Sequence, residues 1–460
     1  MRKKSYSSVL LGFVVAGLCS AQSPCESAKL VALDGAVGDD FGATVAVDGT
    51  IAVVGAPEDD DDDSSSGAAY VFRFDGTDWT QEQKLTASDA AGGDDFGFAV
   101  AISGDMIVVG APRDDTAAGN RAGSAYAFLF DAGQQQWVQW DHIFAPDAGA
   151  DDRFGSSVAL DGDTLLVTAV QDDEAGSNAG AGYVFREVRA AWSFQAKLVG
   201  TSSGTNPQMG RSASLDGDVA VLGAWQDAPN GMFSVGAAHV FRRAGATWSE
   251  EQKLTASDAA DFRWFGQSVS VSGTVIAVGA FGDRADDLSE SGGAYFYTFN
   301  GVSWDELDNV NASDPAANDR FGWSIALDGD NAVIGTGVSA SKAYLFHREL
   351  VVYNEQATLN STDPDVSAEY AYAVALSGTT AVVGDRNAAA GTGLAFVFDL
   401  AGANCPCPWD LDGGGSVGIN DFLSLLAQWG TDPGGPPDFD GDGDVGINDF
   451  LELLANWGPC

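Results

Sequence analysis

The chain has 460 residues and a formal net charge of −44, with 66 acidic residues against 22 lysines and arginines. This charge argues against nucleic acid and anionic membranes as partners, because both are bound through basic surfaces. Calcium and cationic polymers suit such a surface better. The length is sufficient for one large β domain followed by a small second domain.

Residues 1–21 are typical of a secretory signal peptide. Cations at positions 2–4 precede an apolar run over residues 9–18, and residues 19–21 are small enough for cleavage. A lipid anchor on Cys19 is the alternative, but Leu18 is bulky for the position before such a cysteine. No other apolar run is long enough to span a bilayer, so we expect an exported protein without a transmembrane segment.

One sequence unit recurs along residues 28–400, and it joins a Phe-Gly pair to a Gly-Ala-Pro triplet through two apolar runs. The unit returns every 49–58 residues, which indicates one supersecondary unit in seven copies. The first residues of the Phe-Gly pairs, two of them degenerate, are Phe41, Phe96, Phe154, Met209, Phe265, Phe321 and Tyr370.

Each copy predicts four antiparallel strands. In the copy that begins at Phe96, apolar runs at residues 98–102 and 106–111 flank a Ser-Gly-Asp turn. The second run is apolar throughout, as in a strand covered on both faces, and Pro112 ends it because proline donates no hydrogen bond to a sheet. Two more strands follow at residues 124–130 and 137–143. Four strands in each of seven copies predict an all-β, seven-bladed β-propeller.

The glycine of each Phe-Gly pair is expected to adopt a positive φ angle or to let two backbones approach closely. A tryptophan recurs at the start of the fourth strand, where cross-strand packing is favoured over a sugar-binding stripe. These tryptophans are Trp79, Trp137, Trp192, Trp248 and Trp304.

The ends of the repeat array predict how the ring closes. The seventh copy lacks the fourth-strand phrase, which instead stands at the front of the chain over residues 28–34. We therefore expect the N-terminal strand to complete the last blade, which removes the exposed edge of an open array. Cys25 precedes this strand and Cys405 follows the seventh copy, so a Cys25–Cys405 disulfide is a hypothesis for locking the seam.

The loops between strands 2 and 3 and between strands 4 and 1 share one face in this topology, and they are acidic. The functional interpretation is a face that binds cations or a cationic ligand. The alternative, favoured for any single run, is that the carboxylates only solvate the loops. The acidic runs are residues 58–63, 114–115, 172–174, 286–287, 39–40, 94–95 and 151–152.

A second, smaller unit follows the propeller and contains two duplicated segments, residues 410–430 and 438–458. Each segment begins with spaced acids and ends in a predicted helix. In the second segment, acids at positions 1, 3, 5 and 12 of an EF-hand-type loop, with Gly443 at position 6, predict a calcium site. The first segment has Gly414 in place of the position-5 acid and should bind more weakly. The candidate calcium ligands are Asp438, Asp440, Asp442, Asp444 through its carbonyl, and Asp449, and in the first loop Asp410, Asp412, Ser416 and Asp421.

The two predicted helices each carry an apolar stripe at i, i+3, i+4 and i+7, so we expect them to pack on each other with near two-fold symmetry. A unit of this size has a small core, so calcium and a disulfide such as Cys407–Cys460 are expected to stabilise it. The four cysteines that remain after cleavage allow three pairings. The stripes consist of Phe422, Leu425, Leu426 and Trp429 and of Phe450, Leu453, Leu454 and Trp457.

The repeated motifs resemble the FG-GAP repeat family, which includes the integrin α propeller and many bacterial surface proteins. Integrin-type repeats hold a calcium loop between strands 1 and 2. Here that connection is only a short Asp-Gly turn such as Asp48-Gly49, so calcium is not expected in the blades.

The C-terminal unit resembles a Cys-bounded dockerin, a small α-helical, EF-hand-like module that docks into a cohesin on a scaffold or cell surface. The resemblance assigns partner contact to loop positions 10 and 11, which are Ile419-Asn420 and Ile447-Asn448. These are not the small hydroxyl residues usual there, so a partner other than an ordinary cohesin stays open. The expected organisation is a signal peptide (1–21), a propeller (22–404) and a dockerin-like domain (405–460).

The main functional hypothesis is a secreted, surface-attached binding or adhesion protein. Its propeller would bind an extracellular protein or polysaccharide, and its tail would dock in a calcium-dependent manner. An extracellular polysaccharide hydrolase or lyase and a self-assembling envelope protein are the alternatives. No nucleophile motif or metal-binding Cys/His spacing points to an active site, and His142, His239 and His347 lie at unrelated repeat positions. A cluster of His, Arg, Tyr and acid at the channel mouth would favour the enzyme.

Overall fold

A computed structural model describes residues 24–188, 191–201, 206–228, 232–284, 288–337, 342–401, 411, 416–417, 419–430, 437, 445–455 and 458–459. The predicted signal peptide lies outside the described residues. So do several predicted cysteine and calcium-loop positions, namely Cys405, Cys407, Cys460, Asp410, Asp412, Asp438, Asp440, Asp442 and Asp444.

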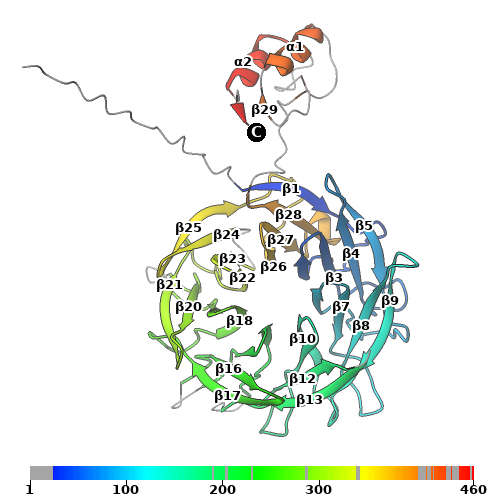
Figure 1. Ribbon diagram of the computed structural model, residues 1–460, viewed down its shortest axis with the longest axis vertical. Coiled ribbons are helices and arrows are strands. Elements are labelled where there is room, and N and C mark those ends of the chain that lie inside the picture. The colour runs from blue at the N-terminus through cyan, green and yellow to red at the C-terminus, as the bar shows by residue number, and fades with distance from the viewer. Residues whose placement is uncertain are drawn as a thin grey trace, which may run out of the picture.

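Seven four-stranded antiparallel sheets form a ring, which confirms the predicted seven-bladed propeller (Figure 1). The first three blades are β2 (Thr44–Asp48), β3 (Ile51–Ala56), β4 (Ala68–Phe74) and β5 (Trp79–Leu85); β6 (Ala99–Ser103), β7 (Met106–Ala111), β8 (Ser124–Asp131) and β9 (Gln136–Ile143); and β10 (Phe154–Asp161), β11 (Thr164–Ala169), β12 (Ala181–Glu187) and β13 (Trp192–Leu198).

The fourth to sixth blades are β14 (Ser212–Asp216), β15 (Val219–Ala224), β16 (Ala237–Ala244) and β17 (Thr247–Leu254); β18 (Phe265–Ser272), β19 (Val275–Ala280), β20 (Gly293–Phe299) and β21 (Trp304–Val310); and β22 (Ser324–Asp328), β23 (Asn331–Gly335), β24 (Ala343–Glu349) and β25 (Val352–Leu359). The seventh blade combines β26 (Tyr370–Ser377), β27 (Thr380–Asp385) and β28 (Leu394–Asp399) with β1 (Cys25–Leu30). A short 3₁₀ turn, Ala389–Gly391, precedes β28.

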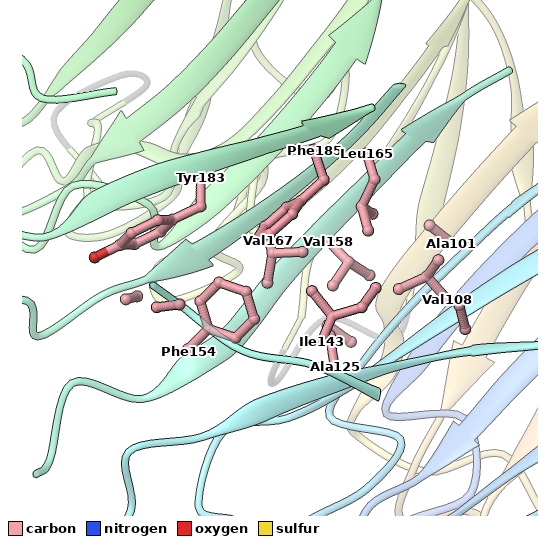
Figure 2. Close-up of a cluster of buried hydrophobic side chains, with 14 of the residues drawn as sticks. Ala101, Val108, Ala125, Ile143, Phe154, Val158, Leu165, Val167, Tyr183 and Phe185 are labelled. Carbon is pink, nitrogen blue, oxygen red and sulfur yellow. The ribbon is translucent and has the colours of Figure 1, made fainter. Parts of the chain in front are cut away.

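The apolar second strand of each blade lies inside the ring of sheets and is covered on both faces. All six residues of β7 are buried, for example, as are all six of β3, β11, β15 and β19. Figure 2 shows the contact between the second and third blades, where Val108 and Ile143 meet Val158 and Leu165. Each large apolar side chain that is fully buried in such a contact contributes roughly 1.5–3 kcal/mol to folding.

The Phe-Gly and Gly-Ala-Pro motifs meet each other across neighbouring blades. Phe96 bridges to Gly67 of the preceding blade, and its ring packs edge-on against Tyr126 of its own blade at 5.4 Å. Gly97 has φ +96°, and a Cβ there would lie 2.2 Å from the Ala68 carbonyl oxygen. A Cβ on Gly55 would lie 2.1 Å from the Gly97 carbonyl oxygen. Both expectations for the glycine, positive φ and close backbone approach, are therefore confirmed.

The N-terminal strand closes the ring as expected. β1 pairs antiparallel with β28, with Leu30 opposite Ala395 and Cys25 opposite Asp399 (Figure 1). The Lys29 ammonium also forms an ion pair with Asp363 at 2.6 Å. Because β1 covers the last strand of the seventh sheet, that sheet keeps no unpaired edge on β28.

The tail contains two nine-residue helices, α1 (Ile419–Ala427) and α2 (Ile447–Ala455), and a short ladder of β29 (Ser416–Val417) with β30 (Gly458–Pro459). Leu425 and Leu453 are buried between the helices, with the Phe422 and Phe450 rings 5.2 Å apart.

The predicted apolar stripes are only partly buried. Leu426, Trp429 and Leu454 are each more than 40% exposed, because the two helices meet along the i and i+3 positions rather than along the whole stripe. Trp457 lies outside the described residues. No helix within the described ranges is both long and apolar enough to traverse a bilayer.

Candidate ligand-binding site

The residue that follows the Phe-Gly pair lies at the mouth of the central channel in every blade. These seven residues line a single cavity of about 440 Å³. They differ in chemical type although the repeat around them is conserved from copy to copy. They are Ala43, Phe98, Ser156, Arg211, Gln267, Trp323 and Tyr372. We call them the rim residues.

A second, open cavity of about 250 Å³ is lined by the first strand of every blade. Apolar side chains make up most of its lining, including Ala101, Ala159 and Ala326. The chemically varied groups are therefore gathered in the first cavity.

One side of the mouth carries charged pairs. Arg113 forms an ion pair with Asp95 at 2.9 Å. Burial nevertheless raises the pKa of Asp95 to about 6, although the Arg113 charge opposes that change. On the seventh blade, Arg386 contacts Glu369 at 2.6 Å and Asp40 of the first blade at 3.6 Å.

An aromatic arc, which we define as Trp225, Phe281, Trp264, Trp323 and Tyr372, adjoins the mouth, and its members Trp323 and Tyr372 line the cavity. Trp264 stacks on Phe281 with centroids 4.8 Å apart, and Phe281 meets Trp323 edge-on at 5.2 Å. Trp323 then approaches Tyr372 at 5.6 Å. The Arg386 guanidinium lies 4.0 Å from the Tyr372 ring centroid, where a cation–π attraction holds both groups.

Several acids predicted to face solvent in the loops instead stabilise the blades. Tyr70 donates its hydroxyl to Asp59 at 2.8 Å, and Lys84 approaches the same carboxylate at 2.9 Å. The third blade repeats this arrangement with Tyr183 and Asp172. Burial and the neighbouring carboxylate raise the pKa of Tyr183 well above its ordinary value.

The same correction applies to the acids before the Phe-Gly pairs. Asp39, Asp94 and Asp152 each accept a backbone N–H from three residues earlier, at 2.6–2.8 Å. Other acids of the same runs are exposed, namely residues 60–63, Asp115, Asp151, Asp173 and Glu174. The acids at residues 286–287 lie outside the described residues.

The recurring tryptophans pack across strands, as expected. Trp137 and Trp304 are almost fully buried, and Trp79 lies 5.4 Å from Phe74 on the neighbouring strand. The histidines stay in separate blades, and none lines the mouth cavity: His239, for example, is buried and contacts Glu250 at 2.7 Å.

The predicted tail sites are described only in part. Asp421 and Asp449 are both buried, at 1% exposure, in the first turns of α1 and α2. Asp449 accepts a hydrogen bond from the Gly446 N–H at 2.6 Å. Within the described ranges no three His, Cys, Asp or Glu side chains converge on a metal site, and most predicted calcium ligands lie outside those ranges.

The predicted partner-contacting residues of the tail, Ile419, Asn420, Ile447 and Asn448, are all exposed. For Ser416 the structure describes the backbone, in β29, and not the side chain.

The rim residues were not identified from the sequence, although a signal for them existed. Aligning the seven copies on the Phe-Gly pair places the rim residues in one column that varies between Ala, Phe, Ser, Arg, Gln, Trp and Tyr. A column that varies within a conserved repeat is typical of a position whose role lies outside the repeat's own packing.

A family model for the FG-GAP repeat matches residues 25–72, 79–128, 137–185, 192–241, 248–297, 304–346 and 353–398. Each matched segment runs from the fourth strand of one blade through the third strand of the next. No curated protein matches the chain. A chain of the solved structure "Crystal Structure of Mitotic Checkpoint Complex" is 12% identical, with a TM-score of 0.49 over 86% of this chain and 99% of that chain. This family model matches most of the length of the chain, so the chain belongs to the FG-GAP repeat family.

Proposed function

We propose that this is an exported, surface-attached binding or adhesion protein that binds an extracellular ligand at the channel mouth of its propeller. The rim residues carry the proposal, because seven equivalent positions differ in chemistry and line one cavity. Aromatic and arginine side chains gather there, and these residue types dominate the energetics of binding sites. A recessed site with a few convergent polar groups is the usual form of a ligand pocket.

The attachment role rests on the tail. Calcium would be held by Asp438, Asp440, Asp442, Asp444 and Asp449 in one loop and by Asp410, Asp412, Ser416 and Asp421 in the other. The position-12 acids, Asp421 and Asp449, are buried in the first turns of α1 and α2, where an EF-hand-type loop places its last calcium ligand. Bound calcium would supply charge neutralisation and tie each loop to its helix.

The exposed apolar side chains of the two helices support docking to a cohesin-like or other cell-surface protein. Ile419 and Leu423 on α1 are matched by Ile447 and Leu451 on α2, and each is more than half exposed. Paired apolar stripes of this kind favour a protein contact over solvent. The identical Ile-Asn pair in both helices allows either copy to present the same surface to the partner.

The disulfide at the seam is part of the same proposal. Cys25 begins β1, the strand that closes the ring, and is the residue that would form this bond. Cys405 is the candidate that follows the seventh blade directly. A covalent seam suits a protein that works outside the cell, where disulfides persist.

An extracellular polysaccharide hydrolase or lyase stays the second candidate, on one observation. Arg386, Tyr372, Glu369 and Asp40 gather at the channel mouth. A Tyr372→Phe variant that abolished the cleavage of a polysaccharide while leaving its binding intact would favour the enzyme. A purely binding role predicts no product with any polysaccharide.

A capture experiment tests the binding function with the full-length chain. Labelled protein is incubated with envelope fragments in calcium and after calcium removal, beside a Trp323→Ala variant and a form that ends at residue 404. Calcium-dependent retention should require the tail. Retention by the propeller should fall in Trp323→Ala. If neither the Trp323→Ala substitution nor the loss of the tail reduces retention, the proposal is refuted.

A further inference from the structure

A side pocket of about 300 Å³ adjoins the channel mouth between the second, third and fourth blades. Three arginines line it, Arg113, Arg153 and Arg211, one from each of these blades. The chain as a whole carries a net charge of −44, so a convergence of three cations is the reverse of its general character. We call this cavity the arginine pocket.

Two of the three arginines have no carboxylate partner within the described residues. Arg113 pairs with Asp95, but neither Arg153 nor Arg211 forms an ion pair there. The buried Nε atom of Arg153 has no hydrogen-bond partner. Arg211 reaches only the amide oxygen of Gln267, at 3.4 Å, and lies 5.5 Å from the Trp225 ring centroid.

The local electrostatics disfavour the charged form of both arginines. Burial, together with the charges of Arg113 and Arg121, lowers the pKa of Arg153, and the charges of Asp151 and Asp95 only partly offset this; burial also lowers the pKa of Arg211. Both directions mean that the surroundings penalise the charged guanidinium, which stays protonated because arginine is so strongly basic. An anion in the pocket would remove the repulsion and supply the missing acceptors.

The backbone at Arg153 is shared with most of the other blades. This residue precedes Phe154 and has φ +58°, and the residue at the same position has a positive φ in the first, second, fourth, fifth and sixth blades. The sixth blade also has an arginine there, Arg320, but that arginine forms an ion pair with Glu290. Arg153 differs from it in having no ion-pair partner within the described residues.

The remaining lining resembles a saccharide site more than a site for an acidic peptide. Ser156, Gln171 and Gln208 bring a hydroxyl and amide groups next to the arginines. Those groups can donate and accept hydrogen bonds with the hydroxyls of a sugar ring. Trp225 offers an apolar ring face and is held by its indole N–H, which donates to Gln208 at 2.8 Å.

We propose that the arginine pocket binds the anionic group, carboxylate or sulfate ester, of an acidic saccharide whose chain continues into the channel mouth. Arg153 and Arg211 donate hydrogen bonds to the anion. Arg113, which is oriented by its ion pair with Asp95, adds positive charge. The inference rests on the proposed binding function and names the ligand class for it. No bond is made or broken in this step.

Calorimetric titration of the full-length protein with defined oligosaccharides tests the proposal. The probes are an oligogalacturonide, its fully methyl-esterified form, a sulfated oligosaccharide of equal length and an oligoglutamate peptide. The first variant is Arg153→Asn, because asparagine tolerates the left-handed backbone at this position. The second variant is Arg211→Gln, because glutamine is the rim residue at the equivalent position of the fifth blade. Arg186→Gln, on the same blade but paired with Asp163 in a different hairpin, removes equal charge as the control.

The charged oligogalacturonide or the sulfated oligosaccharide should bind, and the methyl ester should bind at least tenfold more weakly. Each pocket variant should lose about tenfold or more in affinity, since a hydrogen bond to a charged group is worth roughly 1.5–3 kcal/mol. Arg186→Gln should bind as the wild type does. Carboxylate and sulfate sources are distinguished by which of the two charged probes binds more tightly.

Three outcomes would overturn the inference: tighter binding of oligoglutamate than of either acidic saccharide, equal binding of the methyl ester, or no binding of any probe. Retention on envelope fragments is measured in parallel for the same variants. If retention persists and depends on Trp323 while no acidic saccharide binds, the ligand class is wrong and the binding function stands. If the wild-type protein neither binds a saccharide nor is retained on envelope fragments through its propeller, the binding function itself is refuted.

Discussion

Tyr183 donates its hydroxyl to the Asp172 carboxylate at 2.6 Å, and Lys197 contacts the same oxygen at 2.8 Å. The tyrosine comes from the third strand of the blade, the lysine from the fourth and the aspartate from the loop after the second. One buried carboxylate thus ties three segments of the sheet to one another. The first blade has the same triad, and the second replaces its lysine with His142.

Removing the hydroxyl in Tyr183→Phe should destabilise the protein by about 1–3 kcal/mol, because Asp172 stays buried with one donor fewer. Loss of thermal stability on calorimetric melting measures the effect. Tyr353→Phe is the matched control. The Tyr353 hydroxyl is also buried and has no hydrogen-bond partner, so its removal should cost little or raise the melting temperature. Equal losses in the two variants would show that the hydrogen bond contributes nothing.

Gly97→Ala tests the contact between Phe-Gly and Gly-Ala-Pro motifs of adjacent blades. The new Cβ would lie 2.2 Å from a backbone oxygen at a φ of +96°, so the blades must move apart. We expect a loss of about 3 kcal/mol or more in unfolding free energy. Gly104→Ala is the control in the hairpin of the same blade. Gly104 has φ +56° and open space around it, so the cost should be about 1 kcal/mol. A smaller loss for Gly97→Ala than for Gly104→Ala would contradict the contact.

Asp94 and Asp95 should make the protein more stable as the pH falls from 7 towards 4. Burial raises the pKa of each to about 6, against 3.8 for an unperturbed aspartate. A carboxyl with a raised pKa binds its proton more tightly when folded, so its destabilising effect is complete above pH 6 and disappears below 3.8. The full change in pKa corresponds to about 3 kcal/mol, and solvent screening of these partly exposed groups reduces the expected contribution of each to the order of 1 kcal/mol.

The measurement is the difference in melting temperature between pH 7 and pH 5. The melting temperature of the wild type should rise from pH 7 to pH 5. The rise should be smaller in the Asp94→Asn/Asp95→Asn double variant. Asp105→Asn, at an exposed hairpin turn in the same blade, should leave the wild-type difference unchanged. A double variant that kept the full difference would exclude these two groups as its source.

The seam predicts a specific pattern among cysteine variants. If Cys25 pairs with Cys405, then Cys25→Ser, Cys405→Ser and the double variant should lose the same stability, about 2–4 kcal/mol. Peptide mapping without reduction should recover the Cys25–Cys405 fragment. A Cys405→Ser variant as stable as the wild type would instead assign Cys25 to another cysteine. Leu30→Ala, which opens a cavity in β1, should cost about 2–5 kcal/mol whether or not the disulfide is present.

The sequence predicted the blade count, the strand order and the closure of the ring because each depends on local pattern. The apolar run at residues 106–111 forms one strand whatever its neighbours do. The missing fourth-strand phrase at one end and its presence at the other leave one way to close the ring. The glycine after Phe96 was interpretable for the same reason, since its backbone requirement is the same in every copy.

The buried acids of the loops could not be told from the exposed ones by sequence, because counting carboxylates does not reveal which of them a tyrosine or lysine satisfies. Asp172 and Tyr183 are 11 residues apart, and only the folded blade brings their side chains together. The half-exposed stripes of α1 and α2 have a similar cause, because the angle at which two helices meet decides which part of a stripe is covered.

By itself, then, the sequence determined a wheel of seven sheets, its seam and the position of every repeat residue, since these follow from periodicity and backbone chemistry. Only the tertiary structure decided that the residues after the Phe-Gly pairs share one cavity and that Arg113, Arg153 and Arg211 converge beside it. Successive rim residues are 49–58 residues apart along the chain, and the three arginines are 40 and 58 residues apart. Ring closure makes them neighbours. Contacts between residues of different blades depend on the closed ring, and no single repeat encodes them.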